Sequence, residues 1–122
     1  MPRVQVVFYR DDNGSVPFLE WFDQLSEKAQ DKCGVKIERL GELGYELRRP
    51  EADYLRDGIY ELRVRLRSVN YRMLYFFHGR EVVVLSHGIV KERLVPPDEI
   101  ELALKRKLRF ETDPERHMHE ER

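Results

Sequence analysis

The chain has 122 residues, which is the length of one ordinary domain. Hydrophobic residues make up 41% of it and charged residues 37%, so the composition predicts a packed core beneath a highly charged surface and excludes disorder of the whole chain. The apolar runs are far shorter than the roughly 20 residues that cross a bilayer. The first ten residues contain no apolar segment typical of a secretory signal. We therefore expect one cytoplasmic domain.

The formal net charge is −1, but the charges are unevenly distributed along the chain. Residues 48–109 carry fourteen basic and nine acidic side chains, whereas the segments on either side are acidic. This pattern indicates a localised anion-binding face; the alternative is that the arginines are solvated surface. The single cysteine, Cys33, excludes an internal disulfide and has no partners at zinc-binding spacing, so we expect it in the core and expect no metal site.

The N-terminal third predicts one strand and two helices. Alternating apolar residues in 4–9 indicate a strand that stops at the turn sequence 11–14. Ser15 and Pro17 suit the start of a helix, in which Phe18, Trp21, Phe22 and Leu25 form one apolar stripe. Ser26 is a second cap, for a helix that ends at Gly44.

The middle of the chain predicts a three-stranded meander after a polar, turn-rich segment at 47–57. From residue 60 to residue 67 the apolar side chains alternate with Glu61, Arg63, Arg65 and Arg67, which is typical of a half-buried strand with a cationic outer face. Residues 71–77 and 81–89 are the next two strands, and the Val82–Leu85 run suggests a central position for the last.

The C-terminal segment predicts one more helix and a tail. Pro96, Pro97 and Asp98 suit a helix start, whereas residues 111–122 have no period and are expected to form a flexible charged tail. The predicted order is β-α-α-β-β-β-α in one domain of residues 1–110. This is an α+β fold, with a small and mostly antiparallel sheet whose helices pack on one face. The opposite face would be bare and would carry Arg63, Arg65, Arg67 and Arg72.

An arginine ladder on a strand suits a phosphate backbone. Residues two apart project from one side at roughly 6.5–7 Å, near the spacing of successive phosphates in an extended single strand. A guanidinium can also hold a phosphate with two parallel hydrogen bonds. The alternative is a basic solvent face whose arginines pair with Glu61 and Glu81.

Several segments, taken in order, resemble a known family. These are 57–63 (Asp-Gly-Ile-Tyr-Glu-Leu-Arg), 71–77 (Tyr-Arg-Met-Leu-Tyr-Phe-Phe), 85–91 (Leu-Ser-His-Gly-Ile-Val-Lys), Pro97-x-x-Glu-Ile, the Phe18–Leu25 helix start and the Leu43–Gly44 helix end. The chain resembles the RelE/ParE superfamily of type II toxins, and most of all its HigB-like, phage-derived branch, over roughly residues 3–109.

The resemblance implies a toxin that enters the ribosomal A site, cuts messenger RNA and so inhibits translation. In such endoribonucleases the RNA 2′-hydroxyl attacks the adjacent phosphorus without a metal or other cofactor. An antitoxin encoded beside the toxin, commonly with a helix-turn-helix domain, keeps it silent. This reaction requires cations that stabilise the negative charge of the phosphorane, a base that accepts the 2′-proton and an acid that protonates the 5′-oxygen.

Carried over by position, Arg63, Arg65 and Arg72 match the basic residues that would stabilise the transition state. Lys91 matches the first of two lysines that follow the last strand, while Glu92 stands at the second position. His87 is a candidate for proton transfer because its ordinary pKa suits that role, although a turn histidine is the alternative. The RNA-binding candidates are Arg67, Arg93 and Tyr71. The general base and acid stay open.

Two alternatives come from other functional classes. One is a ParE-like poison of DNA gyrase, which acts by binding; the arginine ladder favours the RNA-cutting branch over it. The other is an inactive toxin homologue that acts with its antitoxin as a corepressor, which the glutamate at position 92 keeps open.

Overall fold

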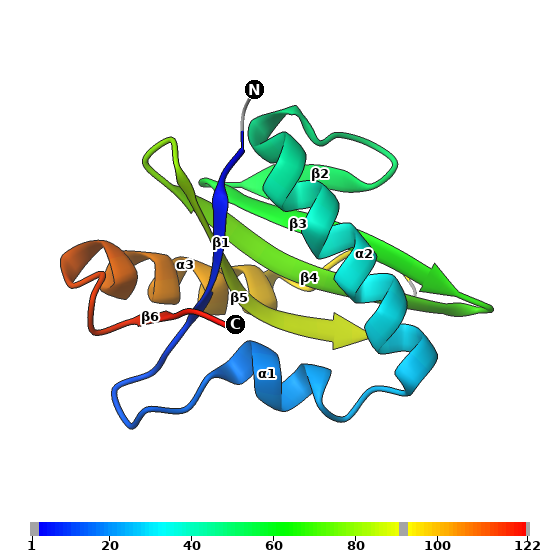
Figure 1. The fold of residues 1–122 in the computed structure, drawn as a ribbon, viewed down its shortest axis with the longest axis horizontal. Coiled ribbons are helices and arrows are strands. Elements are labelled where there is room, and N and C mark those ends of the chain that lie inside the picture. Colours follow the sequence, from blue (N-terminus) through cyan, green and yellow to red (C-terminus); the bar gives the residue numbers. More distant parts are fainter. Residues whose placement is uncertain (1–2, 91–92, 122) are drawn as a thin grey trace.

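The computed structural model describes residues 3–90 and 93–121 (Figure 1). The elements run in the order β1 (Gln5–Tyr9), α1 (Pro17–Phe22), α2 (Glu27–Leu43), the 3₁₀ turn η1 (Gly44–Glu46), β2 (Ala52–Arg56), β3 (Ile59–Leu66), β4 (Val69–His78), β5 (Val82–Val90), α3 (Pro97–Thr112) and β6 (Met118–His119). The predicted α+β class is confirmed.

The strands of the described residues form one six-stranded sheet in the order β2-β3-β4-β5-β1-β6. β1 pairs parallel with β5, and every other neighbouring pair is antiparallel, as the sequence predicted for most of the sheet. β2 pairs with β3 only as far as Ala52 opposite Leu62. The second half of β3 therefore extends beyond β2 at the edge of the sheet.

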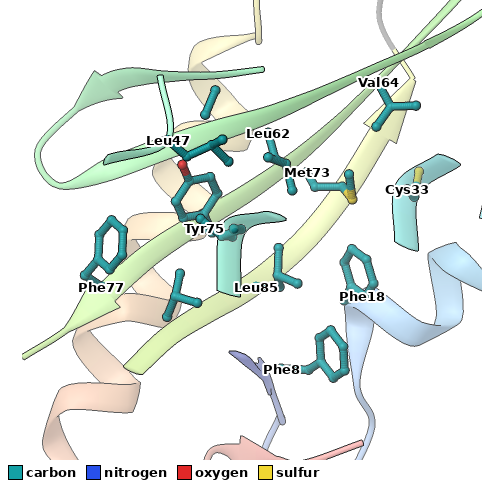
Figure 2. Close-up of a cluster of buried hydrophobic side chains, with 13 residues drawn as sticks. Phe8, Phe18, Cys33, Leu47, Leu62, Val64, Met73, Tyr75, Phe77 and Leu85 are labelled. Atoms are coloured by element: carbon teal, nitrogen blue, oxygen red, sulfur yellow. The ribbon is translucent and has the colours of Figure 1, made fainter. Parts of the chain in front are cut away.

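Helices cover both faces of the sheet, so the prediction that they pack on one face was wrong. α1 and α2 lie over the face that contains Phe8, Leu62, Met73 and Tyr75, the core that Figure 2 shows. α3 crosses the other face, behind the sheet in Figure 1, over a second apolar cluster. The physical reason is that the central strands are apolar on both sides, as in Val82–Leu85, and both sides require cover.

Local signals position α2 as the sequence predicted. α1 differs: it begins after Val16 with no side-chain cap, so Ser15 does not cap it, and it ends at Phe22 before Leu25. Ser26 caps α2 by accepting a hydrogen bond from the Ala29 N–H at 3.2 Å, and Gly44 follows the helix with a φ of 55°. Cys33 is buried in the core, as expected. α1 lies close to β5, because a Cβ at Gly88 would lie 2.2 Å from the Trp21 ring. Only glycine at position 88 leaves room for that ring.

Two segments differ from the sequence prediction. β2 lies in the segment that reads as polar and turn-rich, because only Ala52 of its five residues is buried. The expected tail is also ordered: residues 111 and 112 continue α3, and β6 pairs with β1. His117 is 5% exposed, stacks on Tyr9 with 5.3 Å between ring centroids, and shares a hydrogen bond with Arg10 O at 2.8 Å. Contacts with residues about one hundred positions away in the sequence fix this tail.

Candidate functional site

A buried carboxylate joins the two arginines that the sequence places on neighbouring strands. Arg63 on β3 lies directly opposite Arg72 on β4, and Glu61 projects from the same face two residues earlier. Arg72 Nη1 donates to Glu61 Oε1 at 2.5 Å, while Arg63 Nε and Nη2 donate to Oε2 at 3.0 and 2.8 Å. The Glu61 side chain is only 3% exposed. Each oxygen of one carboxylate therefore holds one arginine.

The carboxylate explains why two like charges are tolerated side by side. Directly opposed cations on a sheet repel each other, and a buried anion between them offsets that repulsion. Arg63 Nη2 also donates to Asp53 Oδ2 at 3.1 Å, and Asp53 pairs with Arg49 at 2.9 Å. The hydrogen bond from Arg49 holds the pKa of Asp53 below its ordinary value. The guanidinium planes are thus held in place from several sides.

These arginines open onto a groove of about 550 Å³ where β3 extends beyond β2. Its lining comes from α2, from the segment before β2, and from β3 and β4: Lys32, Val35, Lys36, Pro50, Glu51, Arg63, Val64, Arg65, Asn70 and Arg72. Five of these side chains are cations, one is a carboxylate, and Val35, Pro50 and Val64 are apolar. Such a groove suits an anionic ligand with apolar parts.

The α2 side of the groove was not predicted from the sequence. Lys32 Nζ donates to Arg65 O at 2.9 Å, and Lys36 Nζ donates to Glu51 Oε1 at 3.0 Å. Glu51 also accepts two hydrogen bonds from Arg39, at 2.5 and 2.9 Å. The hydrogen bond from Arg39 is the main cause that lowers the pKa of Glu51, to about 2. The only sequence signal for this wall is a polar helix face, which does not show what lies opposite.

The groove and the side chains paired with it have an excess of positive charge. The cations are Lys32, Lys36, Arg39, Arg49, Arg63, Arg65 and Arg72, and the carboxylates are Glu51, Asp53 and Glu61. Seven cations against three carboxylates leave four positive charges. Arg63, Arg65 and Arg72, from the predicted anion-binding face, therefore line a groove at the sheet edge and not a bare sheet face.

The structure separates Arg67 and Tyr71 from this groove. Arg67 lies in the β3–β4 turn with a φ of 57°, and with Tyr71 it lines a second hollow beside the start of α2. Tyr71 belongs to the face opposite Arg72, where its ring is 6.4 Å from that of Trp21. Arg65 remains in the groove, and its Nε donates to Arg67 O at 3.0 Å. The predicted four-arginine ladder ends at Arg65 because the strand ends at Leu66.

His87 lies under α3 and does not line the groove. A β-bulge in β5 places both Ser86 and His87 opposite Leu74, so that neighbouring side chains share the α3 face. His87 shares hydrogen bonds with Ser86 Oγ at 2.8 Å and Glu99 Oε1 at 2.9 Å, and it is 6% exposed. Burial, reinforced by nearby Arg106, lowers its pKa below the ordinary value. This geometry ties β5 to the first turn of α3.

The two remaining sequence candidates lie between β5 and α3. Arg93 is exposed there, and Lys91 lies outside the described residues. Among residues 3–90 and 93–121, no group of three or more histidine, cysteine or acidic side chains is arranged to hold a metal ion. Within the same residues, no helix is long and apolar enough to cross a bilayer.

Fold and groove together define a small α+β domain with a cationic site at the edge of its sheet. Comparison with protein families gives a match over residues 20–108 to the family described as phage-derived protein Gp49-like (DUF891). The chain belongs to this family, which is of the RelE toxin type and is associated with toxins of toxin–antitoxin systems. The resemblance to a phage-derived toxin family is thereby confirmed. No curated protein matches the chain.

Proposed function

We propose that this protein is the toxin of a type II toxin–antitoxin system and that it cuts messenger RNA on the ribosome. The observation that carries the proposal is the pair Arg63 and Arg72, held side by side by Glu61 at a cationic groove. Membership of a toxin-associated family supports it. The HigB-like branch is part of the same proposal.

The proposed reaction is attack of an RNA 2′-hydroxyl on the adjacent phosphorus. The O2′–P bond forms and the P–O5′ bond breaks, which leaves a 2′,3′-cyclic phosphate and a free 5′-hydroxyl. Arg63, Arg65 and Arg72 stabilise the negative charge that develops on the phosphorane oxygens. Their guanidinium groups are held before the substrate arrives, so little reorganisation is needed. Lys91 is proposed as a further catalytic cation, and Arg93 as an RNA-binding residue.

Groups other than the buried His87 transfer the protons in this proposal. His87 is enclosed by Ser86, Glu99 and α3, and it therefore supports the fold in this proposal. Glu51 lines the groove, but its pKa of about 2 makes it a weak proton acceptor. We propose that the ribosome positions the substrate and takes part in the proton transfers. The proposed partner that silences the toxin is an antitoxin with a helix-turn-helix domain.

The test is translation in a purified ribosome system, followed by primer extension on the messenger RNA. The wild-type protein is compared with Arg63→Ala/Arg72→Ala. A matched control is Arg56→Ala/Arg109→Ala, which removes two arginines whose side chains are 40% and 45% exposed and lie outside the groove. Circular dichroism shows whether each variant is folded. We expect cuts at A-site codons that require ribosomes, that persist in the control and that are lost in the test variant.

Two other results would contradict parts of this proposal. Messenger RNA that stays intact with wild-type protein contradicts the proposed nuclease. Cuts that persist in a folded Arg63→Ala/Arg72→Ala variant keep the nuclease but remove these arginines from its site.

A second candidate is a toxin that binds its target without cutting it. The specific observation in its favour concerns the described residues that line the groove: they include one carboxylate, Glu51, whose pKa is about 2, and they do not include His87. DNA gyrase is then the target to test, by a supercoiling assay. An inactive homologue that acts as a corepressor would inhibit neither translation nor gyrase and would bind operator DNA together with its antitoxin.

A further inference from the structure

One side of α2 presents an exposed apolar residue between two anchored lysines. Lys32, Val35 and Lys36 occupy positions i, i+3 and i+4 of the helix, so they share one face. Val35 is 55% exposed, although the opposite side of the same helix buries Ala29, Cys33 and Leu40. This face borders the groove and does not pack into the core.

The two lysines are held at the groove wall by groups across it. Lys32 Nζ donates one hydrogen bond to Arg65 O, and Lys36 Nζ donates one to Glu51. An ammonium group has three donors, so each can also bind a phosphate oxygen. Because their positions are set by these anchors, less side-chain freedom is lost when a ligand binds.

Three apolar side chains line the same groove as the lysines and the arginines. Val35, Val64 and Pro50 line it, from α2, β3 and the segment before β2. The volume of about 550 Å³ falls within the roughly 300–1,000 Å³ of small-ligand sites. A nucleotide combines an anionic phosphate with a base whose faces are apolar, and this is the chemistry that the two parts of the groove complement.

We propose that the α2 wall is a subsite for one nucleotide of single-stranded RNA, beside the phosphate that Arg63 and Arg72 hold. Lys32 and Lys36 bind the phosphate of that nucleotide, and Val35, Val64 and Pro50 contact its base. The subsite rests on the proposed function, since it extends the same RNA path from the sheet onto α2. It adds helix residues to a site that the sequence placed wholly on the strands and the segment that follows them.

The test measures binding without cleavage. A fluorescein-labelled single-stranded RNA whose 2′-positions are all methylated cannot be cut, and its anisotropy reports affinity without ribosomes. The variants are Lys32→Gln and Val35→Ala, both at exposed positions where a loss of folding is not expected. The control is Lys28→Gln, which removes an exposed α2 lysine that lines the second hollow and not the groove.

We expect each groove variant to weaken binding in its own way. Lys32→Gln should weaken affinity about tenfold and reduce the slope of log affinity against log salt by about 0.7, because one phosphate contact is lost. Val35→Ala should weaken affinity about threefold and leave that slope unchanged, because an apolar contact releases no counterion. Lys28→Gln should behave as the wild-type protein does.

The outcomes separate the subsite from the nuclease. Lys32→Gln and Val35→Ala proteins that bind like Lys28→Gln overturn the subsite, and so does a wild-type protein that does not bind the RNA. If ribosomal cutting persists in either case, the proposed function stands without the subsite. If the groove variants behave as expected but the wild-type protein cuts no messenger RNA, the subsite stands and the nuclease does not.

Discussion

The carboxylate of Glu61 accepts a hydrogen bond from Arg72 at 2.5 Å while it is almost completely buried. Its second oxygen holds Arg63, so one anion sets the direction of two guanidinium groups. A buried charge that loses its partner is strongly destabilising, whereas an intact and well hydrogen-bonded pair is tolerated. Glu61 therefore links the stability of the sheet to the geometry of the groove.

Replacing Glu61 by glutamine tests this link. Glu61→Gln keeps the shape of the side chain but removes the countercharge that Arg63 and Arg72 share, and Asp53 remains only beside Arg63. We expect the free energy of unfolding to fall by about 3 kcal/mol. The measurement is the urea midpoint, with an unchanged slope as evidence that two-state unfolding is kept. The exposed substitution Asp31→Asn is the control, and equal midpoints for the two variants would show that the buried pair contributes little.

Arg72→Ala tests whether the arginine acts on the target or on the antitoxin. The side chain is 13% exposed and lies at the groove, so its loss should relieve toxicity in growing cells. Affinity for the antitoxin should stay within about tenfold of the wild-type value, or about 1.4 kcal/mol. Growth curves and calorimetry with the purified antitoxin check the two expectations. Toxicity retained by a well-expressed variant would remove Arg72 from the site.

Gly88 and Gly34 form a matched pair with opposite expected effects. A Cβ at Gly88 would lie 2.2 Å from the Trp21 ring, whereas nothing lies within 4 Å of a Cβ at Gly34 in α2. Gly88→Ala should therefore cost about 1–3 kcal/mol through overpacking. Gly34→Ala should stabilise the protein by about 0.5–1 kcal/mol, because alanine favours the helix. Thermal unfolding compares the stability of the two variants. A Gly88→Ala variant as stable as the wild-type protein would show that α1 can shift on β5 to make room for the added methyl group.

His87 should make stability depend on pH. Because burial lowers its pKa, the folded protein keeps the imidazole neutral at a pH where the unfolded chain binds a proton. Stability is therefore complete above the ordinary pKa of 6.5 and decreases as the pH falls below it. Glu99, Arg106 and Ser86 face the imidazole, and Glu99 opposes the shift by favouring the charged form.

The pH dependence is measured by urea unfolding at about pH 7.5 and about pH 5.5. We expect the loss of stability between these values to be smaller in His87→Gln than in the wild-type protein. His119→Gln, at a half-buried position in β6, is the control. His87→Gln should still cut messenger RNA if it folds. An equal loss in His87→Gln and the wild-type protein would show that other groups cause the dependence.

The sequence predicted the parts of this protein that are encoded by local pattern. The period of two in residues 60–67 gave β3, and Ser26 and Gly44 gave both ends of α2. The placement of Arg63 and Arg72 on neighbouring strands followed from the same patterns. The α2 wall of the groove did not, because Lys32 and Val35 differ from ordinary solvent residues only through what lies across from them.

Long-range contacts explain the remaining differences. α3 covers the face of the sheet that the sequence left bare, because an apolar run such as Val82–Leu85 does not show which face each helix takes. His87 looked available for chemistry because a histidine near a strand end suits proton transfer. Its burial comes from Glu99, twelve residues away, and from a bulge that no local signal marks.

The C-terminal segment allows a test of whether the contacts of residues 113–121 stabilise the fold. His117 stacks on Tyr9, and Arg10 donates to the carbonyl oxygens of Arg116 and Glu115 at 3.1 and 3.2 Å. Truncation after Thr112 removes these contacts, and we expect it to lower the free energy of unfolding by about 2 kcal/mol.

Truncation after His119 is the control for that experiment, since it keeps β6 against β1. The urea midpoints of the two truncated proteins and the full chain are compared. We expect the shorter protein to unfold at lower urea and the longer one to match the full chain. A protein ending at Thr112 that is as stable as the full chain would show that the tail contributes nothing to folding. The ordered contacts around His117 would then have to be offset by the conformational entropy lost in forming them.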